Sequence, residues 1–154
     1  MNEGLNTDFQ RLTQGFPELL GRLRRDTYPS GMSRTIPKRG VYAFRDGAVT
    51  WYVGRTDKMG RRWTQHVGAG CNENQASFAF LLARDEARKA RIWARTRKAL
   101  ARDGRFKPFF GSAKARIREM SRHAVEIVDP QKQALFEIYA AVALRAKYCD
   151  FRNH

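Results

Sequence analysis

Four side chains in this sequence could together hydrolyse a phosphodiester, namely Tyr52, Arg62, His66 and Glu137. Such a reaction needs a proton acceptor for the attacking water and positive charge beside the phosphate. Arg62 suits the phosphate, because its planar guanidinium binds two oxygens and keeps its charge. Arg62 and His66 are four residues apart, so on a helix they would lie on one face. Glu137 offers a hard carboxylate for Mg²⁺ (or Mn²⁺), with water and phosphate oxygens completing the coordination.

The proton acceptor that chemistry alone favours is His66. An unperturbed histidine has a pKa near about 6.5 and an unperturbed tyrosine one near about 10, so the histidine is the better match to neutral pH.

A predicted β-hairpin positions the two tyrosines. Residues 40–54, GVYAFRDGAVTWYVG, form two β-rich runs around an Asp-Gly turn signal. A two-residue loop would place Tyr42 and Tyr52 on opposite faces of the sheet, whereas a three-residue loop with Gly47 in the left-handed region places them on one face. The second register also keeps the apolar residues on one side, so we predict the three-residue loop. The predicted pairs are Tyr42 with Thr50 and Tyr52 with Gly40.

The pair of triplets Gly40-Val41-Tyr42 and Tyr52-Val53-Gly54 resembles the signature of the GIY-YIG nuclease family. The family's later motif positions follow in order, and the resemblance covers residues 40–68 closely and 122–153 more loosely. It implies an α+β fold with a small three-stranded antiparallel sheet flanked by helices. It also implies cleavage of DNA with one divalent metal ion. The catalytic residues that it carries over are Tyr42, Tyr52, Arg62, His66, Glu137 and Asn153.

The resemblance also implies how the work is divided among these residues. Tyr42 is slightly favoured as the proton acceptor, with its pKa lowered by Arg62 and the metal. Tyr52 and His66 would orient the water and the phosphate. Asn153 would position the metal-binding glutamate or the substrate strand.

Each residue also has an ordinary structural interpretation. The two tyrosines could be half-buried strand residues, because aromatic side chains favour strands. Arg62 could be one of many solvated cations, and His66 could lie on a helix surface. Glu137 could form a salt bridge with an arginine. Their joint occurrence in the right order is what favours a catalytic site.

The charge of the chain indicates a polyanionic partner. Its 154 residues include 30 Lys and Arg against 15 Asp and Glu, a net charge of +15 with a pI near 10.7. Nucleic acid is the leading candidate, because polyanions relieve such an excess. A solvated helix with internal ion pairs is the alternative for the basic segment 84–102. The predicted DNA-contacting residues are Arg55, Arg61, Arg84, Arg88, Lys89, Arg91, Arg95, Lys114 and Arg116.

The chain is expected to hold one nuclease domain over residues 36–154, preceded by a packed N-terminal arm over 1–35. A helical pattern in the arm is interrupted by Gly15 and Pro17. The domain would carry a long basic helical insert at about residues 70–115. Neither the arm nor this insert is explained by the GIY-YIG resemblance.

Within and around the insert we predict one continuous basic helix over residues 77–103. Residues 105–120 are expected to be less regular, with Lys114 and Arg116 on an extended segment. The remaining expected elements are a helix over about 58–68, a third strand over 122–130 and a final helix over 131–148.

The sequence argues against several protein classes. Cys71 and Cys149 lie far apart without C-x-x-C spacing, which is typical of reduced thiols rather than of a disulfide framework or a zinc site. No apolar run approaches the roughly 20 residues of a membrane helix, and the N-terminus lacks a signal-peptide pattern. We therefore expect a cytoplasmic protein with no membrane partner.

The expected function is metal-dependent endonucleolytic cleavage of double-stranded DNA, in the manner of restriction and phage-type members of the family. Two cuts across a duplex need a homodimer or two successive nicks, and we expect a homodimer. The alternatives are a basic nucleic-acid-binding module without catalytic activity and a nuclease acting on RNA.

Overall fold

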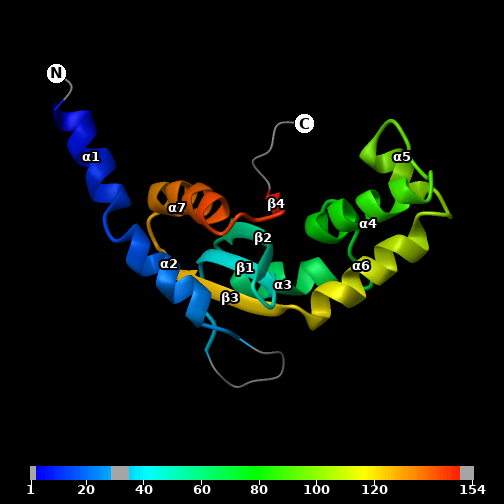
Figure 1. Cartoon of the computed structure of the whole chain (residues 1–154), viewed down its shortest axis with the longest axis horizontal. Helices are drawn as coiled ribbons and strands as arrows, with labels where there is room; N and C mark the ends of the chain where they lie inside the picture. The colour runs from blue at the N-terminus through cyan, green and yellow to red at the C-terminus, as the bar shows by residue number, and fades with distance from the viewer. Residues whose placement is uncertain (1–2, 29–34, 150–154) are drawn as a thin grey trace. The chain divides into compact units, whose positions relative to one another are not determined.

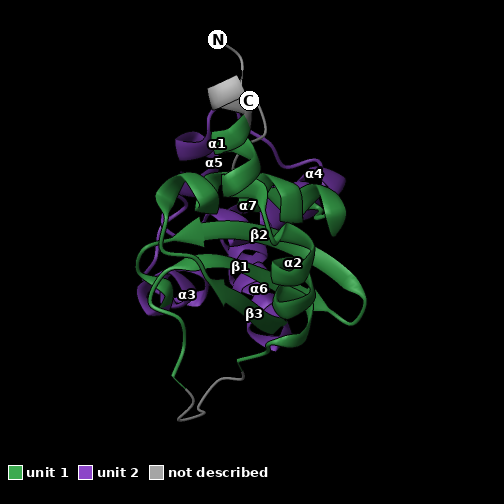
Figure 2. Cartoon of the chain, turned by 90° about the vertical axis from the view of Figure 1, so that its left-hand side faces the viewer, with its two compact units in different colours: residues 1–59, 121–154 green, residues 60–120 purple. Residues whose placement is uncertain are grey.

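The computed structural model describes residues 3–28 and 35–149, which form seven helices and four strands (Figure 1). The chain divides into two compact units (Figure 2). Unit 1 comprises Met1–Met59 and Ser121–His154, and unit 2 comprises Gly60–Met120. The helices of the predicted N-terminal arm therefore belong to the same unit as the strands.

The sheet of unit 1 contains β1 (Gly40–Asp46), β2 (Val49–Thr56), β3 (Ser121–Glu126) and β4 (Tyr148–Cys149). The strand order is β3-β1-β2-β4, with β1 antiparallel to β2 and β3, and β4 parallel to β2. The α+β class is confirmed. The predicted purely antiparallel, three-stranded sheet is wrong in detail, because the two-residue β4 adds a parallel strand at the free edge of β2.

The hairpin of β1 and β2 brings Tyr42 and Tyr52 onto one face of the sheet, as predicted. It does so in a different register, because Tyr42 pairs with Gly54 and Tyr52 pairs with Phe44. Both predicted pairs are therefore wrong. The face is nevertheless right, because directly opposed residues share a face and residues two apart along a strand do so as well.

The loop and the irregularity of the hairpin also differ from the prediction. Asp46 pairs with Val49 around a two-residue turn, with Gly47 in the left-handed region at φ 59°. A β-bulge then adds Trp51 to β2 as one extra residue, between Thr50, which pairs with Arg45, and Tyr52, which pairs with Phe44. The Trp51 ring stacks on Tyr148 of β4, with ring centroids 6.5 Å apart and planes 19° apart.

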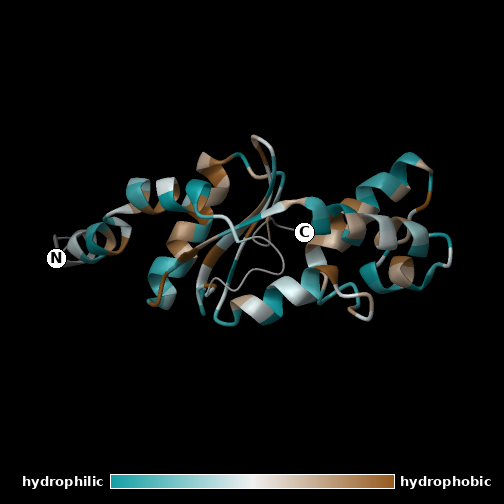
Figure 3. Ribbon diagram, turned by 90° about the horizontal axis from the view of Figure 1, so that it is seen from below, coloured by the Kyte–Doolittle hydropathy of each residue, from teal (hydrophilic) through white to brown (hydrophobic). Residues whose placement is uncertain are grey.

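The core of unit 1 lies between the sheet and its helices. These are α1 (Glu3–Thr13), α2 (Phe16–Arg25) and α7 (Pro130–Ala143). Val41, Ala43 and Val53 form a buried cluster with apolar residues of α2 and α7. The ring of Phe16 on α2 meets that of Phe136 on α7 at 5.2 Å between centroids. Helix α2 buries Phe16, Leu20 and Leu23 and exposes its charged residues, and Figure 3 shows hydrophobic and hydrophilic residues following one another along the helices.

The ends of α2 and α7 can be compared with the predicted helix limits. The helical pattern of the arm is interrupted at Gly15, as predicted, since α1 ends at Thr13 and α2 begins at Phe16, with Pro17 tolerated in its first turn. Asp129 caps α7 by accepting hydrogen bonds from the backbone N–H groups of the two residues after Pro130. The helix ends at Ala143 rather than at residue 148, because Arg145 adopts a left-handed φ of 51°.

Unit 2 is helical. It contains α3 (Met59–Val67), which begins one residue earlier in unit 1, α4 (Ser77–Lys89), α5 (Arg97–Arg102) and α6 (Lys107–Glu119). The rings of Phe80 on α4 and Phe106, the residue before α6, meet at 5.4 Å between centroids. None of the described helices of the chain is long and apolar enough to cross a membrane.

Two predictions for this unit are wrong. The continuous helix over residues 77–103 is broken, because Arg91 adopts a left-handed φ of 62° and the Ile92 N–H donates back to Ala87 O at 2.9 Å. These are the features of a Schellman-type helix end. The segment expected to be irregular is α6, so Lys114 and Arg116 lie on a helix.

Candidate active site

The two tyrosines of the predicted site lie together in unit 1. Both are fully buried, and their ring centroids are 6.0 Å apart. Tyr42 lies opposite Gly54, where a Cβ would come within 2.7 Å of the Tyr42 Oη and 2.9 Å of the Tyr52 Cε1. The absence of a side chain at Gly54 is therefore what lets the Tyr42 phenol lie across β2.

The first glycine of the paired triplets has a steric reason of its own. Gly40 adopts a φ of 146°, a backbone conformation that L residues rarely adopt. A Cβ there would lie 2.0 Å from the carbonyl oxygen of Val125 on β3. Gly40 and Gly54 thus each allow a close contact within unit 1. Gly40 lets β3 approach, and Gly54 leaves room for the Tyr42 phenol.

Glu137 forms an ion pair with the residue that follows Gly54. The Arg55 Nε donates to Glu137 Oε2 at 3.0 Å, and the exposed fractions of the two side chains are 47% and 10%. Strand alternation places the Gly54 position on the tyrosine face and Arg55 on the face that α7 covers. Tyr42 and Glu137 are thus each tied to β2 at neighbouring residues, from opposite faces of the strand.

A second contact, which the sequence did not reveal, joins the same parts of unit 1. Gln133 lies one helical turn before Glu137 on α7, and its Nε2 donates to Asp57 Oδ1 at 3.2 Å and to Ile127 O at 2.7 Å. The Gln133–Asp57 and Glu137–Arg55 contacts therefore connect two successive turns of α7 to the end of β2. No local pattern marks Asp57 or Gln133, because the contact joins residues 76 positions apart.

Arg62 and His66 lie on α3 in unit 2, at the predicted i and i+4 spacing. The Arg62 guanidinium donates to Ser77 Oγ at 2.9 Å and to Gln75 O at 3.0 Å. His66 is fully buried, with its ring edge-on to Phe78 at 6.4 Å between centroids. Burial, and then the charge of Arg62, hold the pKa of His66 well below its usual value. The imidazole is therefore neutral at neutral pH, and it is not a helix-surface histidine.

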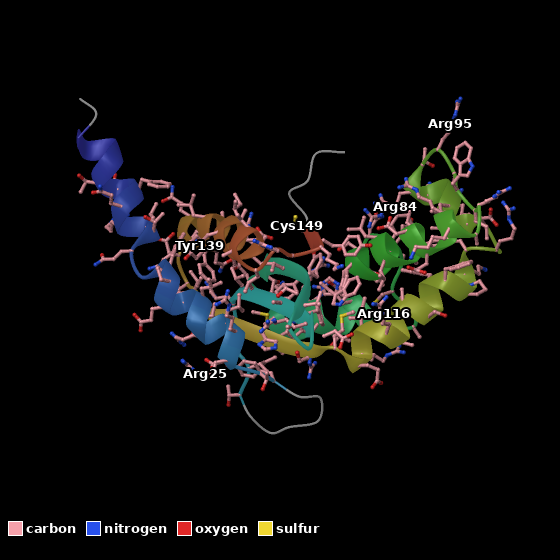
Figure 4. All side chains as sticks on the ribbon, in the orientation of Figure 1. Arg25, Arg84, Arg95, Arg116, Tyr139 and Cys149 are labelled. Atoms are coloured by element: carbon pink, nitrogen blue, oxygen red, sulfur yellow. The ribbon has the colours of Figure 1, made fainter. Side chains whose placement is uncertain are left out.

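The remaining predicted residues fall into three groups. Asn153 lies outside the described residues. Arg84 is partly buried beside Asp85 at 3.6 Å, and Lys89 pairs with Glu86 at 2.7 Å. Apart from Lys114, the other predicted cations of unit 2 are exposed, and Figure 4 shows the side chain of one of them, Arg95, pointing outward from its segment. The exposed set is Arg61, Arg88, Arg91, Arg95 and Arg116.

Lys114 is buried and has a structural role, whereas a DNA contact needs an exposed side chain. Its side chain is 5% exposed, and its ammonium donates to Gly68 O at 2.8 Å and Cys71 O at 2.7 Å. The same ammonium lies 4.2 Å from the centre of the Phe110 ring. Its hydrogen bonds thus go to carbonyls of unit 2, which corrects the prediction.

The carboxylate of Glu137 is the group in unit 1 that could hold a metal ion. Among the described residues, no three or more His, Cys, Asp and Glu side chains are grouped to share one. Magnesium is commonly held through one or two carboxylates, with water and substrate phosphates completing its shell. The donor set at Glu137 fits that simpler kind of site, in which a cation would compete with Arg55 for the carboxylate.

Comparison of the chain with protein-family models, curated proteins and solved structures finds no match in any of the three. The structure itself assigns the protein to the α+β class, with a four-stranded mixed sheet in one unit and helices in the other.

Proposed function

We propose that the protein is a metal-dependent DNA endonuclease of the GIY-YIG type. The observation that carries the proposal is the packing of Tyr42 and Tyr52 around Gly54, with Glu137 tied, from the other face of β2, to the next residue of that strand. The two halves of the paired signature are thereby in contact, and the carboxylate comes from a helix far along the chain. A net charge of +15 supports DNA as the substrate.

The roles follow from the chemistry of each group. Tyr42 accepts the proton of the attacking water, and Tyr52 and His66, which is neutral, orient the water and the phosphate. Arg62 stabilises negative charge on the phosphate. Glu137 holds Mg²⁺ or Mn²⁺, which when bound would neutralise charge developing on the leaving oxygen.

Incubation with supercoiled plasmid tests the activity. We expect nicking that requires Mg²⁺ or Mn²⁺ and that disappears in Glu137→Gln, which keeps the size of the side chain and removes its charge. The matched control is Glu126→Gln, because Glu126 is an exposed glutamate of the same unit. Gel-shift titration with the same DNA should show that both variants still bind. Cleavage by Glu137→Gln at the wild-type rate, or no cleavage by the wild-type protein with either metal, would contradict the proposal.

A nucleic-acid-binding module without catalytic activity is the second candidate, and one observation favours it. The Glu137 carboxylate already has a cationic partner in Arg55, which matches the salt-bridge interpretation of this glutamate. The plasmid assay separates the two, since a module binds without cutting in either metal. The same assay with an RNA substrate tests the third candidate, an RNA-directed nuclease.

A homodimer would supply two sites for the two strands of a duplex. Sedimentation of the protein alone and with a short duplex tests this part of the proposal. A dimer predicts linear plasmid as an early product, whereas a monomer acting by successive nicks predicts that open circles accumulate first. A cytoplasmic location accords with such a substrate, and fractionation of cells that express the protein tests it.

A further inference from the structure

An exposed tryptophan stands at the centre of the segment that joins α4 to α5 in unit 2. Trp93 is 67% exposed, whereas Trp63 of the same unit is 3% exposed. Arg91 and Arg95 flank it and are both exposed. A large indole left in water is unusual, because burying it would be strongly favourable. Such an exposed aromatic residue therefore calls for a partner.

The backbone presents this segment by an uncommon device. The left-handed residue that ends α4 is usually glycine, but here it is Arg91, at φ 62°. Its N–H donates to Arg88 O at 2.9 Å, and the next N–H donates to Ala87 O at 2.9 Å. These two hydrogen bonds fix the C-terminal end of α4, and Arg91 occupies a position at which glycine would be favoured. The cation is placed two residues before Trp93.

The surroundings of Trp93 in the chain are strongly positive. Unit 2 holds fifteen Lys and Arg against five Asp and Glu, so it carries +10 of the net charge of +15. Residues 88–107 contain nine of these cations and a single acid, Asp103, which pairs with Arg105 at 2.8 Å. In the described part of the chain, Arg91 and Arg95 form no ion pair with a carboxylate. The charge beside Trp93 is therefore available to an anion.

We propose that Trp93 stacks on an unpaired base of a DNA strand whose phosphates bind Arg91 and Arg95. Every base offers a flat π face to an indole, and cations spaced around an aromatic residue match the repeat of phosphate and base along a single strand. Bases inside a duplex are already stacked, so the indole selects unpaired nucleotides or a locally opened duplex. An apolar protein partner is disfavoured, because it would desolvate the surrounding cations without neutralising them. The choice of DNA over RNA rests on the proposed function.

Fluorescence and binding titrations with oligothymidylate test the inference. We expect quenching of tryptophan emission on binding, and loss of most of that quenching in Trp93→Phe, which leaves Trp51 and Trp63 in place. Trp93→Ala should weaken binding of the single strand by about tenfold, within the range for one stacked base. Binding to a fully paired duplex of the same length should weaken by much less. The matched control is Val142→Ala, because Val142 is an apolar residue of unit 1 with 69% exposure.

Salt titrations separate stacking from charge. Arg91→Gln and Arg95→Gln should each lower the slope of log affinity against log salt by about one, whereas Trp93→Ala should leave that slope unchanged. Wild-type affinity of Trp93→Ala for the single strand would overturn the proposal. So would loss of self-association in that variant with DNA binding intact, because Trp93 would then contact another copy of the chain.

The experiment also distinguishes this inference from the proposed function. Glu137→Gln should lose cleavage and still show the quenching that depends on Trp93. Cleavage that persists without any such quenching would refute the stacking role and leave the nuclease proposal standing. Tighter stacking on oligouridylate than on oligothymidylate would refute the assignment of DNA.

Discussion

The Arg55 Nε lies 3.0 Å from Glu137 Oε2, so the end of β2 is joined to α7 through the proposed metal ligand. The ion pair is asymmetric in exposure, with the carboxylate nearly buried and the guanidinium half in water. A buried carboxylate without a partner would be costly, so a cation is expected there in every state of the protein. Arg55 supplies that cation in this structure, and the proposed metal ion would have to compete with it for the carboxylate.

The first prediction concerns this competition. Arg55→Gln should tighten binding of Mn²⁺ to the protein, because the metal no longer displaces a guanidinium. A half-exposed ion pair contributes about 1 kcal/mol or less, so the gain should not exceed about fivefold. Titration followed by the electron paramagnetic resonance of free Mn²⁺ measures it without reference to cleavage. Arg61→Gln removes an exposed cation of unit 2 and serves as the control. Equal Mn²⁺ affinity in Arg55→Gln and the wild type would rule out the competition.

The second prediction concerns the close approach at Gly54. Gly54→Ala should destabilise the protein by about 1–3 kcal/mol, because its Cβ would meet two fully buried rings that cannot move aside. Gly111→Ala is the matched control. Gly111 lies inside α6 with open space around its Cβ, so the same change there should stabilise by about 0.5–1 kcal/mol. Urea unfolding measures both, and equal effects would show that the packing around Gly54 is misassigned.

The third prediction is a loss of stability in mild acid. The folded protein resists protonation of His66, whereas the unfolded chain takes up that proton near pH 6.5. Stability is therefore full above about pH 6.5 and falls as the pH drops from there towards the lower pKa of the folded state, by up to about 1.4 kcal/mol per pH unit. His123, whose pKa burial also lowers, contributes in the same direction.

His66→Gln cannot titrate, so it should remove part of this dependence and leave the part due to His123. Unfolding by urea at several pH values between about 7.5 and 5 measures the effect above the range in which carboxylates titrate. A free energy of unfolding that is constant over this interval would contradict the buried, neutral state of both imidazoles.

The fourth prediction separates a structural lysine from a surface one on the same helix. Lys114→Met should destabilise the protein by about 2–3 kcal/mol, because two carbonyl oxygens of unit 2 lose a charged donor. Lys107→Met, at an exposed position of α6, should leave stability within about 0.5 kcal/mol of the wild type. Thermal unfolding measures both. DNA affinity should follow the opposite order, falling in Lys107→Met and changing little in folded Lys114→Met.

The sequence predicted that Tyr42 and Tyr52 share a face of the sheet, but it failed on the register and on the face of Thr50, which pairs with Arg45. Alternation with a period of two is a local property, so Tyr42 and Tyr52 could be assigned to one face. The register depends on the bulge at Trp51, whose ring packs on Tyr148 almost a hundred residues later, and no local pattern announces that contact.

The same limit applies to the candidate site and to the insert. Arg55 and Glu137 are 82 positions apart, so their ion pair could be anticipated only as a general possibility for a glutamate in a basic chain. The break in the predicted helix over residues 77–103 was missed because Arg91 occupies the left-handed position at which glycine would have signalled an end. Sequence periodicity therefore predicted elements and faces, while tertiary contacts decided boundaries and pairings.

The bulge at Trp51 has a consequence for the edge of the sheet. Without the bulge, the two-residue turn would oppose Tyr52 to Ala43, so the extra residue is what returns Tyr52 to the face of Tyr42. The indole of Trp51 also contacts the residues at β4. Tyr148 stacks on its ring, and the Lys147 ammonium lies 4.8 Å from the ring centre. The bulge thus helps to hold β4 beside β2 at Tyr52 and Val53, where the edge of the sheet is already paired and closed to strands of other molecules.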